Sequence, residues 1–212
     1  MGRKTQPIKD TKQLLRFLDY LEETDKPMYV LASIMLYTGF RVGDVRDLVV
    51  GEVRGDVLAI NEKKTRYLER LHKKDLKAKR KHPRQPKPIR VITIHKDLKR
   101  ILKEYTYGKL KSDLLFPSPF NPNKALSYSQ INRRLQCAAY AVGIDKFATH
   151  VLRKTSFYRI YAKNNNIAEV QNFAGHGSSK ETAMYLGLDD DMRQQSVMEM
   201  DDLTELRRRN TY

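Results

Sequence analysis

Residues 27–44 read PMYVLASIMLYTGFRVGD, and this stretch predicts the centre of the fold. Pro27 suits the first turn of a helix, because its ring presets the helical backbone angle. Its lack of an N–H costs nothing there, since N–H groups of the first turn have no partner within the helix. Gly39 suits the end of that helix, because glycine accepts the left-handed conformation of a helix C-terminus. The sequence therefore predicts a long apolar helix that delivers the chain directly to Arg41.

The sequence around this helix predicts mostly further helices. Residues 10–23 carry apolar side chains at helical spacing behind Asp10, a typical N-cap residue. Further helices are expected at 42–49, 96–105, 127–141, 151–162, 167–174, 180–188 and 192–200. Residues 57–60 and 89–94 have the composition of strands, and residues 116–123 read as a loop. The expected fold is mainly α with a small antiparallel β-sheet (α+β).

The positive charge of the chain is large and concentrated. The formal net charge is +16, and the segment from Lys63 to Arg90 holds thirteen lysines or arginines against two acidic residues. Such a field attracts polyanions, either nucleic acid or an anionic membrane surface, and excludes a basic partner. No stretch approaches the roughly eighteen unbroken apolar residues of a spanning helix, and the N-terminus lacks the apolar core of a signal peptide. We therefore expect a cytoplasmic protein without a membrane partner.

The single cysteine offers no function. Cys137 cannot form an internal disulfide, and its neighbours Leu135, Ala138 and Ala139 are apolar. We expect an ordinary buried thiol.

Four short motifs carry the functional side chains: TGFRVGD at 38–44, KT at 64–65, THVLRKT at 149–155, and AGH at 174–176 followed by Tyr185. Arg41 and Arg153 could each donate two parallel hydrogen bonds to a phosphate, which lysine cannot do. Asp44, three residues after Arg41, could hold the Arg41 guanidinium in place. Both arginines lie in apolar sequence contexts, where an unpaired charge is costly, so we expect them to have partners.

In order and spacing, these motifs resemble the tyrosine recombinase, or phage integrase, family over nearly the whole chain. Arg41 and Lys64 are 23 residues apart, as are Arg153 and His176, and Tyr185 follows His176 by nine. The resemblance implies the catalytic-domain fold of that family. It also implies a site-specific DNA recombinase that cuts and rejoins strands through a covalent 3′-phosphotyrosine.

The resemblance assigns a role to each group of the expected site. Arg41 and Arg153 clamp the phosphate, Tyr185 is the nucleophile, and Lys64 protonates the 5′ oxygen from a turn between strands. A phenol is neutral at pH 7 and must lose its proton as it attacks, which makes His150 the expected general base or proton relay. His176 either bonds the phosphate and orients the site or only packs. Lys63, adjacent to Lys64, remains an alternative for the hairpin lysine.

Residues 1–212 are expected to form a single catalytic domain without the separate N-terminal helical domain that most family members carry. We expect residues 63–90 to form a long basic hairpin or loop. This segment either extends the phosphate-binding surface or is a disordered basic loop. The tail helix within 189–212 docks either on a neighbouring protomer or on its own domain. The cations expected to contact DNA are Lys63, Arg66, Lys73, Lys74, Arg90 and Lys154.

The expected partner is double-stranded DNA at attachment sites, bound by a tetramer, with a monomer in solution left open. No metal or other cofactor is expected, because arginines and a lysine take the place of cations. Asp189, Asp190 and Asp191 are adjacent acids that suit a helix N-terminus better than a metal site. Three other functions stay open: a non-catalytic DNA-binding protein on the same fold, a type IB topoisomerase, and a metal-dependent nuclease or transposase, for which converging acids are missing from the sequence.

Overall fold

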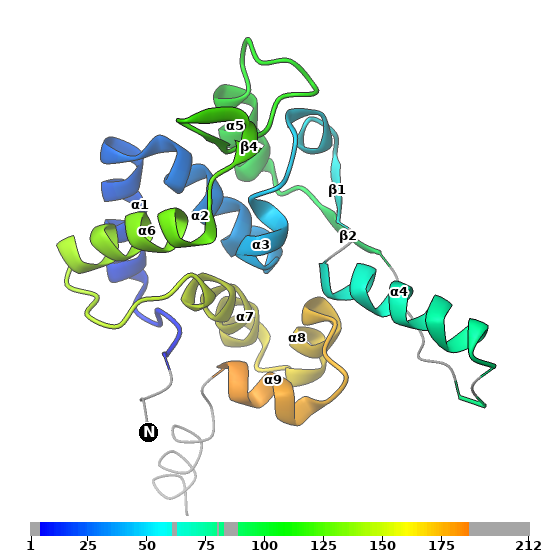
Figure 1. Cartoon of the computed structure of the whole chain (residues 1–212). Coiled ribbons are helices and arrows are strands. Elements are labelled where there is room, and N and C mark those ends of the chain that lie inside the picture. The colour runs from blue at the N-terminus through cyan, green and yellow to red at the C-terminus, as the bar shows by residue number, and fades with distance from the viewer. Residues whose placement is uncertain (1–4, 61–62, 80, 83–88, 187–212) are drawn as a thin grey trace, which may run out of the picture. The chain divides into compact units, whose positions relative to one another are not determined.

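The structure, a computed structural model, describes residues 5–60, 63–79, 81–82 and 89–186, without the side chains of residues 63–66 and 68. The chain divides after Ser156 into two compact units. The first unit contains α1 to α6, both small sheets and the beginning of α7, and the second contains the remainder of α7 with α8 and α9. The structure is mainly helical, as expected, and Figure 1 shows the order of its elements.

Helix α2 (Lys26–Thr38) is the centre of the first unit. It packs against α1 (Thr11–Thr24), α3 (Val42–Val45), α5 (Lys96–Tyr105) and α6 (Tyr128–Ala141). Consecutive residues Val30, Leu31 and Ala32 are fully buried, because neighbours cover this helix on several sides. The helix ends as expected: Gly39 has a φ of 62°, and its amide donates to the carbonyl of Met35 at 2.9 Å.

Helices α1 and α6 begin at side-chain caps. The carboxylate of Asp10 accepts from the amide of Lys12 at 2.9 Å, and Ser127 and Gln130 form a reciprocal capping box. The expectation that Cys137 is buried is wrong, since its side chain is exposed. The helical period turns Ile131, Leu135, Ala138 and Ala139 of α6 inward, and Cys137 falls outside that face.

Two antiparallel two-stranded sheets lie in the first unit. Strand β1 (Val57–Ile60) pairs with β2 (Arg90–Thr93), with Ile60 opposite Arg90. Strand β3 (Pro117–Ser118) pairs with β4 (Asn121–Ala125), within a segment expected to be only a loop. The short helix expected over 42–49 ends at Val45, and a 3₁₀ turn, η1 (Val50–Val53), follows.

The connection between β1 and β2 differs from the expected hairpin turn or loop. It contains the helix α4 (Lys63–Lys77), which leads away from the ends of the two strands in Figure 1. No glycine or proline lies between residues 63 and 77, and most of the residues there are good helix formers. Lys63 and Lys64 therefore lie in the first turn of a helix instead of a tight turn between strands.

The second unit is a small helical cluster. Helix α7 (His150–Asn164) enters it, followed by α8 (Ile167–Ala174) and α9 (Ser179–Leu186). Phe157, Val170, Ala174 and Leu186 form its buried centre. The helix expected at 192–200 and the tail of 189–212 lie outside the described residues. Among the helices that the structure describes, none is both long and apolar enough to cross a membrane.

Candidate active site

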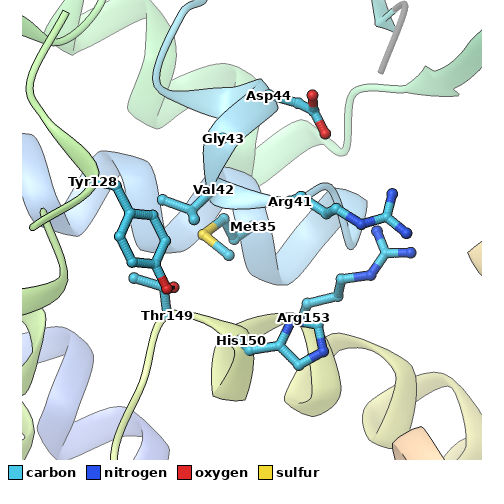
Figure 2. Close-up of a pocket in the computed structure, with 9 residues that line it drawn as sticks. All are labelled: Met35, Arg41, Val42, Gly43, Asp44, Tyr128, Thr149, His150 and Arg153. Atoms are coloured by element: carbon cyan, nitrogen blue, oxygen red, sulfur yellow. The ribbon is translucent and has the colours of Figure 1, made fainter. Parts of the chain in front are cut away.

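Arg41, Asp44, His150 and Arg153 line one pocket of about 280 Å³ in the first unit. The other residues around it are Met35, Val42, Gly43, Tyr128 and Thr149. Figure 2 shows the guanidinium groups of Arg41 and Arg153 extending in the same direction, with His150 on the same helix as Arg153. Residues more than a hundred positions apart in sequence therefore place two arginines and a histidine around one cavity.

Arg153 is almost completely buried, with 1% of its surface exposed. Its Nη1 donates a hydrogen bond to the carbonyl of Gly39, at the end of α2. A guanidinium is a planar fork with five N–H donors, so one bond to a fixed carbonyl limits the orientation of the whole group. The expectation that Arg153 has a partner is confirmed by this contact.

Arg41 is half-buried and lies in the turn between α2 and α3. Its backbone is extended (φ −77°, ψ 143°), and its neighbours Phe40 and Val42 are both buried. The side chains on either side are thus held in the core, which leaves Arg41 directed toward the pocket. Asp44 is 7% exposed and lines the same pocket, while its expected role as the holder of the Arg41 guanidinium remains a prediction.

His150 is the first residue of α7, and the preceding residue anchors that end of the helix. The Thr149 hydroxyl donates to the Tyr128 phenol oxygen at 3.1 Å, and its amide donates to Asn132 Oδ1 at 3.2 Å. Tyr128 and Asn132 belong to α6 and have no place in the sequence motifs. Their contribution arises from packing, so no local sequence signal could have revealed it.

His176 and Tyr185 lie together in the second unit, with ring centroids 4.8 Å apart. His176 is 8% exposed, and its Nδ1 lies 3.1 Å from Thr182 Oγ1. Phe157 contacts both rings, at centroid distances of 5.4 Å from His176 and 5.7 Å from Tyr185. Gly175 (φ 66°) ends α8 and turns the chain into His176. This histidine is thus both packed and hydrogen-bonded within the second unit, and its expected role at the phosphate remains a prediction.

Among the predicted DNA-binding residues whose side chains the structure describes, none lines this pocket. The side chains of Lys63, Lys64 and Arg66 lie outside the described residues, whereas Lys73 and Lys74 are exposed on α4. Lys154 is half-buried, and its ammonium donates to the carbonyl of Thr5. Arg90 is also half-buried and donates to the carbonyl of Thr38 at 3.3 Å. Lys154 and Arg90 thus make contacts within the protein, which were not predicted along with their expected role in binding DNA.

In the part of the chain that the structure describes, no group of three or more histidine, cysteine or acidic side chains is placed to hold a metal ion. The three consecutive acids at 189–191 lie outside that part. The groups gathered in the pocket of the first unit suit a phosphate, because guanidinium donors match its oxygens in charge and geometry.

Comparison with known proteins gives the same result as the motifs. Residues 8–192 match the phage integrase family. The chain belongs to this family. It is 32% identical over 187 residues to the probable integrase/recombinase YoeC of Bacillus subtilis, a match that covers 88% of this chain and 91% of YoeC. The predicted family and the predicted class of enzyme, a tyrosine site-specific recombinase, are thereby confirmed.

Solved structures of this family share the fold. The XerA recombinase superposes with a TM-score of 0.67 at 19% identity, covering 95% of this chain and 66% of the XerA chain. A lambda integrase tetramer bound to a Holliday junction superposes with a TM-score of 0.59 at 19% identity, covering 87% of this chain and 49% of that chain. The chain therefore spans about two thirds of the length of the XerA chain and about half of the lambda integrase chain. The expected catalytic-domain fold is confirmed.

Proposed function

We propose that this integrase cuts and rejoins duplex DNA at specific sites, through a covalent 3′-phosphotyrosine formed at Tyr185. The observation that carries the proposal is the pocket shared by Arg41, His150 and Arg153. Two guanidinium groups and an imidazole at one cavity suit a phosphodiester whose negative charge grows during the reaction. Family membership supplies the nucleophile, Tyr185, at its expected distance in sequence from His176.

The proposed reaction has two balanced steps. In the first, Tyr185 Oη attacks the scissile phosphorus, its proton passes to His150, and the bond from phosphorus to the 5′ oxygen breaks. The leaving 5′ oxygen takes a proton from Lys64, a role that rests on the family resemblance. In the second, a 5′ hydroxyl gives its proton to Lys64 and attacks the phosphotyrosine, and Tyr185 leaves as a phenol with the proton returned by His150. Each step exchanges one phosphate ester for another, so no external energy source is required.

The arginines stabilise this reaction by charge and by position. Arg153 is well suited because its guanidinium is buried and oriented by the Gly39 carbonyl, and electrostatic stabilisation is stronger where water is excluded. Arg41 contributes a second guanidinium from a different segment. Together they neutralise the two non-bridging oxygens, where charge accumulates in the transition state.

The exposed cations of α4 form a proposed second contact with DNA. Arg70, Lys73, Lys74 and Lys77 are exposed and lie at positions i, i+3, i+4 and i+7, which places them on one face of the helix. We call this set the α4 basic stripe. Its charge and spacing suit the phosphates of a duplex, with which basic side chains make contacts independent of sequence.

The proposed assembly is a tetramer on two DNA duplexes. Its support is the shared fold with lambda integrase, a protein whose structure is a tetramer on a Holliday junction. Strand exchange between two duplexes needs four cleavages, which agrees with four protomers. Because the proposed substrate is chromosomal or element DNA, we also propose that the protein acts in the cytoplasm.

A nicked suicide substrate tests the central proposal. Cleavage beside a nick releases a short fragment that carries the 5′ hydroxyl needed for resealing, so the covalent adduct accumulates. A pool of duplexes randomised around the nick removes the need to know the target sequence. With a chelator present, we expect an adduct on denaturing gels and a modified Tyr185 peptide by mass spectrometry.

The matched variants decide between the possible functions. Tyr185→Phe should abolish the adduct, whereas Tyr161→Phe, which alters another partly buried tyrosine of the second unit, should retain it. An adduct that survives Tyr185→Phe, or one that forms only with magnesium, would refute the proposal. Duplex binding without any adduct would favour a non-catalytic DNA-binding protein. Relaxation of supercoiled DNA without strand exchange would favour a type IB topoisomerase.

A further inference from the structure

Two consecutive backbone carbonyls at the end of α2 are held by arginines from distant segments. Arg90, the first residue of β2, donates from Nη2 to the carbonyl of Thr38 at 3.3 Å. Arg153 of α7 donates from Nη1 to the carbonyl of Gly39. The last carbonyls of a helix have no partner within the helix and carry the negative end of its dipole, so cationic donors suit them.

Arg90 makes a second contact with the same turn. Its guanidinium lies 4.7 Å from the centroid of the Phe40 ring, and Phe40 is fully buried. A planar cation over an aromatic face is attracted by the ring electrons, and it excludes water from that face. Arg90 thus contacts both the residue that ends α2 and the residue that directly precedes Arg41.

The turn itself is closed by short-range hydrogen bonds. The Thr38 hydroxyl donates to the carbonyl of Ile34 at 2.6 Å and accepts from the amide of Phe40 at 3.2 Å. Gly39 adopts the left-handed conformation that this path requires. On its C-terminal side, the Arg41 carbonyl accepts from the amides of Asp44 at 2.8 Å and Val45 at 3.0 Å. On its N-terminal side, the backbone of Arg41 depends on how firmly the Thr38 and Gly39 carbonyls are held.

We propose that Arg90 is a positioning residue for Arg41, and that it acts by holding the turn of residues 38–41 from the start of β2. The expected effect of Arg90 on the cleavage rate rests on the proposed function. Its expected effect on the turn of residues 38–41 rests only on the contacts described above. It gives Arg90 a role inside the protein in place of the expected contact with DNA. It also links the site to β2, the strand that follows the basic helix α4 in the chain.

The geometry calls specifically for arginine at position 90. A planar guanidinium can donate within its plane to the carbonyl while its face covers the phenyl ring, whereas an ammonium is a point charge without a face. Lysine would retain the charge and could donate to the Thr38 carbonyl, but it has no planar face to cover the Phe40 ring. Glutamine would retain a donor but lose the charge, and so would lose the attraction to both the ring and the helix end.

Amide hydrogen exchange and single-turnover cleavage test this proposal together. Arg90→Gln should speed amide exchange at residues 39–42. It should also slow adduct formation on the suicide substrate roughly ten- to hundredfold, the scale of loss expected when a catalytic group is misplaced. The dissociation constant for the duplex should change little. Arg90→Lys should fall between the wild type and Arg90→Gln, and serves as the second variant if Arg90→Gln does not fold.

Arg54 provides a matched control, because its guanidinium also donates to backbone carbonyls, those of Thr106 and Lys109. Arg54→Gln should lower the melting temperature without slowing adduct formation or loosening residues 39–42. A double substitution, Arg41→Lys with Arg90→Gln, should cleave about as slowly as Arg41→Lys alone, because Arg90 acts through Arg41.

The outcomes separate this inference from the proposed function. If the wild type forms no adduct, the proposed cleavage fails, while the exchange data still decide whether Arg90 holds the turn. Unchanged exchange at 39–42 in Arg90→Gln would overturn the inference, and so would faster exchange accompanied by wild-type cleavage. Equal slowing by Arg54→Gln would show a general effect of stability instead.

Discussion

Single hydrogen bonds orient the candidate catalytic side chains in both units. In the second unit, Thr182 Oγ1 lies 3.1 Å from His176 Nδ1 and donates to the Ser178 carbonyl at 3.2 Å. A hydroxyl has one proton and two lone pairs, so Thr182 can accept from Nδ1 while it donates to the Ser178 carbonyl, or it can donate to Nδ1. In either case Thr182 holds the ring orientation of His176.

The Thr182 contact leads to a prediction at this scale. Thr182→Val keeps the shape of the side chain but leaves a buried imidazole nitrogen without its hydrogen-bond partner, which should cost about 1–3 kcal/mol of stability. Thermal unfolding measures the loss, and the suicide substrate should show slower adduct formation as the imidazole loses its orientation. Thr182→Ser keeps the hydroxyl and should restore both properties. If the valine variant is as stable and active as the wild type, the hydrogen bond has no such role.

At the scale of elements, α4 is the feature that most changes the expected picture. The sequence predicted a basic hairpin or loop, and the structure gives a 15-residue helix. A loop would present its cations in many arrangements, whereas a helix presents those of the α4 basic stripe on one face at a fixed spacing. A fixed spacing can match successive phosphates of a duplex, which makes an ordered contact with DNA more favourable.

The α4 basic stripe predicts a change in salt dependence. Replacing Arg70, Lys73, Lys74 and Lys77 by glutamine should flatten the plot of log affinity against log salt, because fewer phosphates are then neutralised by the protein. The slope should fall by about 0.9 for each phosphate that the stripe neutralises in the wild type. Fluorescence anisotropy of a labelled duplex at several salt concentrations measures the slope.

Helix α5 offers a control with the same spacing and the same total charge. Lys96, Lys99, Arg100 and Lys103 are exposed at i, i+3, i+4 and i+7, and Lys99 is already paired with Asp56. Replacing these four by glutamine should change the slope much less. Equal changes in the two variants would indicate a general effect of net charge and would rule out a specific contact at α4.

At the scale of the whole molecule, charge and length point to limited DNA affinity. A net charge of +16 favours contact with any duplex, but these 212 residues span about half of the DNA-bound lambda integrase chain that shares their fold. A smaller contact surface makes fewer phosphate contacts. For these 212 residues taken by themselves, we therefore expect modest binding of a duplex by a single protomer and tighter binding with further protomers or another partner.

This expectation is tested by titrating a short labelled duplex with the protein at physiological salt. The dissociation constant for the first bound protomer should lie above the nanomolar range, with tighter binding when several protomers assemble. Analytical ultracentrifugation of the complexes gives the number of protomers bound. Nanomolar binding by a lone protomer would contradict the prediction.

The sequence by itself determined the family, the main helices and the identity of the candidate catalytic residues. The apolar helix that ends at Gly39, the capping box at Ser127 and the spacing from Arg41 to Tyr185 are local patterns, so they can be read without knowing the packing. Helix α4 could also have been predicted, because its segment lacks glycine and proline and is rich in helix formers. A dense run of like charges also favours a disordered segment, which opposes that signal.

Only the tertiary structure decided how the side chains meet. The contacts of Arg90 and Arg153 with the end of α2, of Thr149 with Tyr128, and the pairing of β3 with β4 join segments that are separate in sequence. Such contacts depend on which surfaces pack together, and local propensity does not encode that. The same reason explains Cys137, which lies among apolar neighbours in sequence and yet faces outward, because the helical period and not adjacency sets burial.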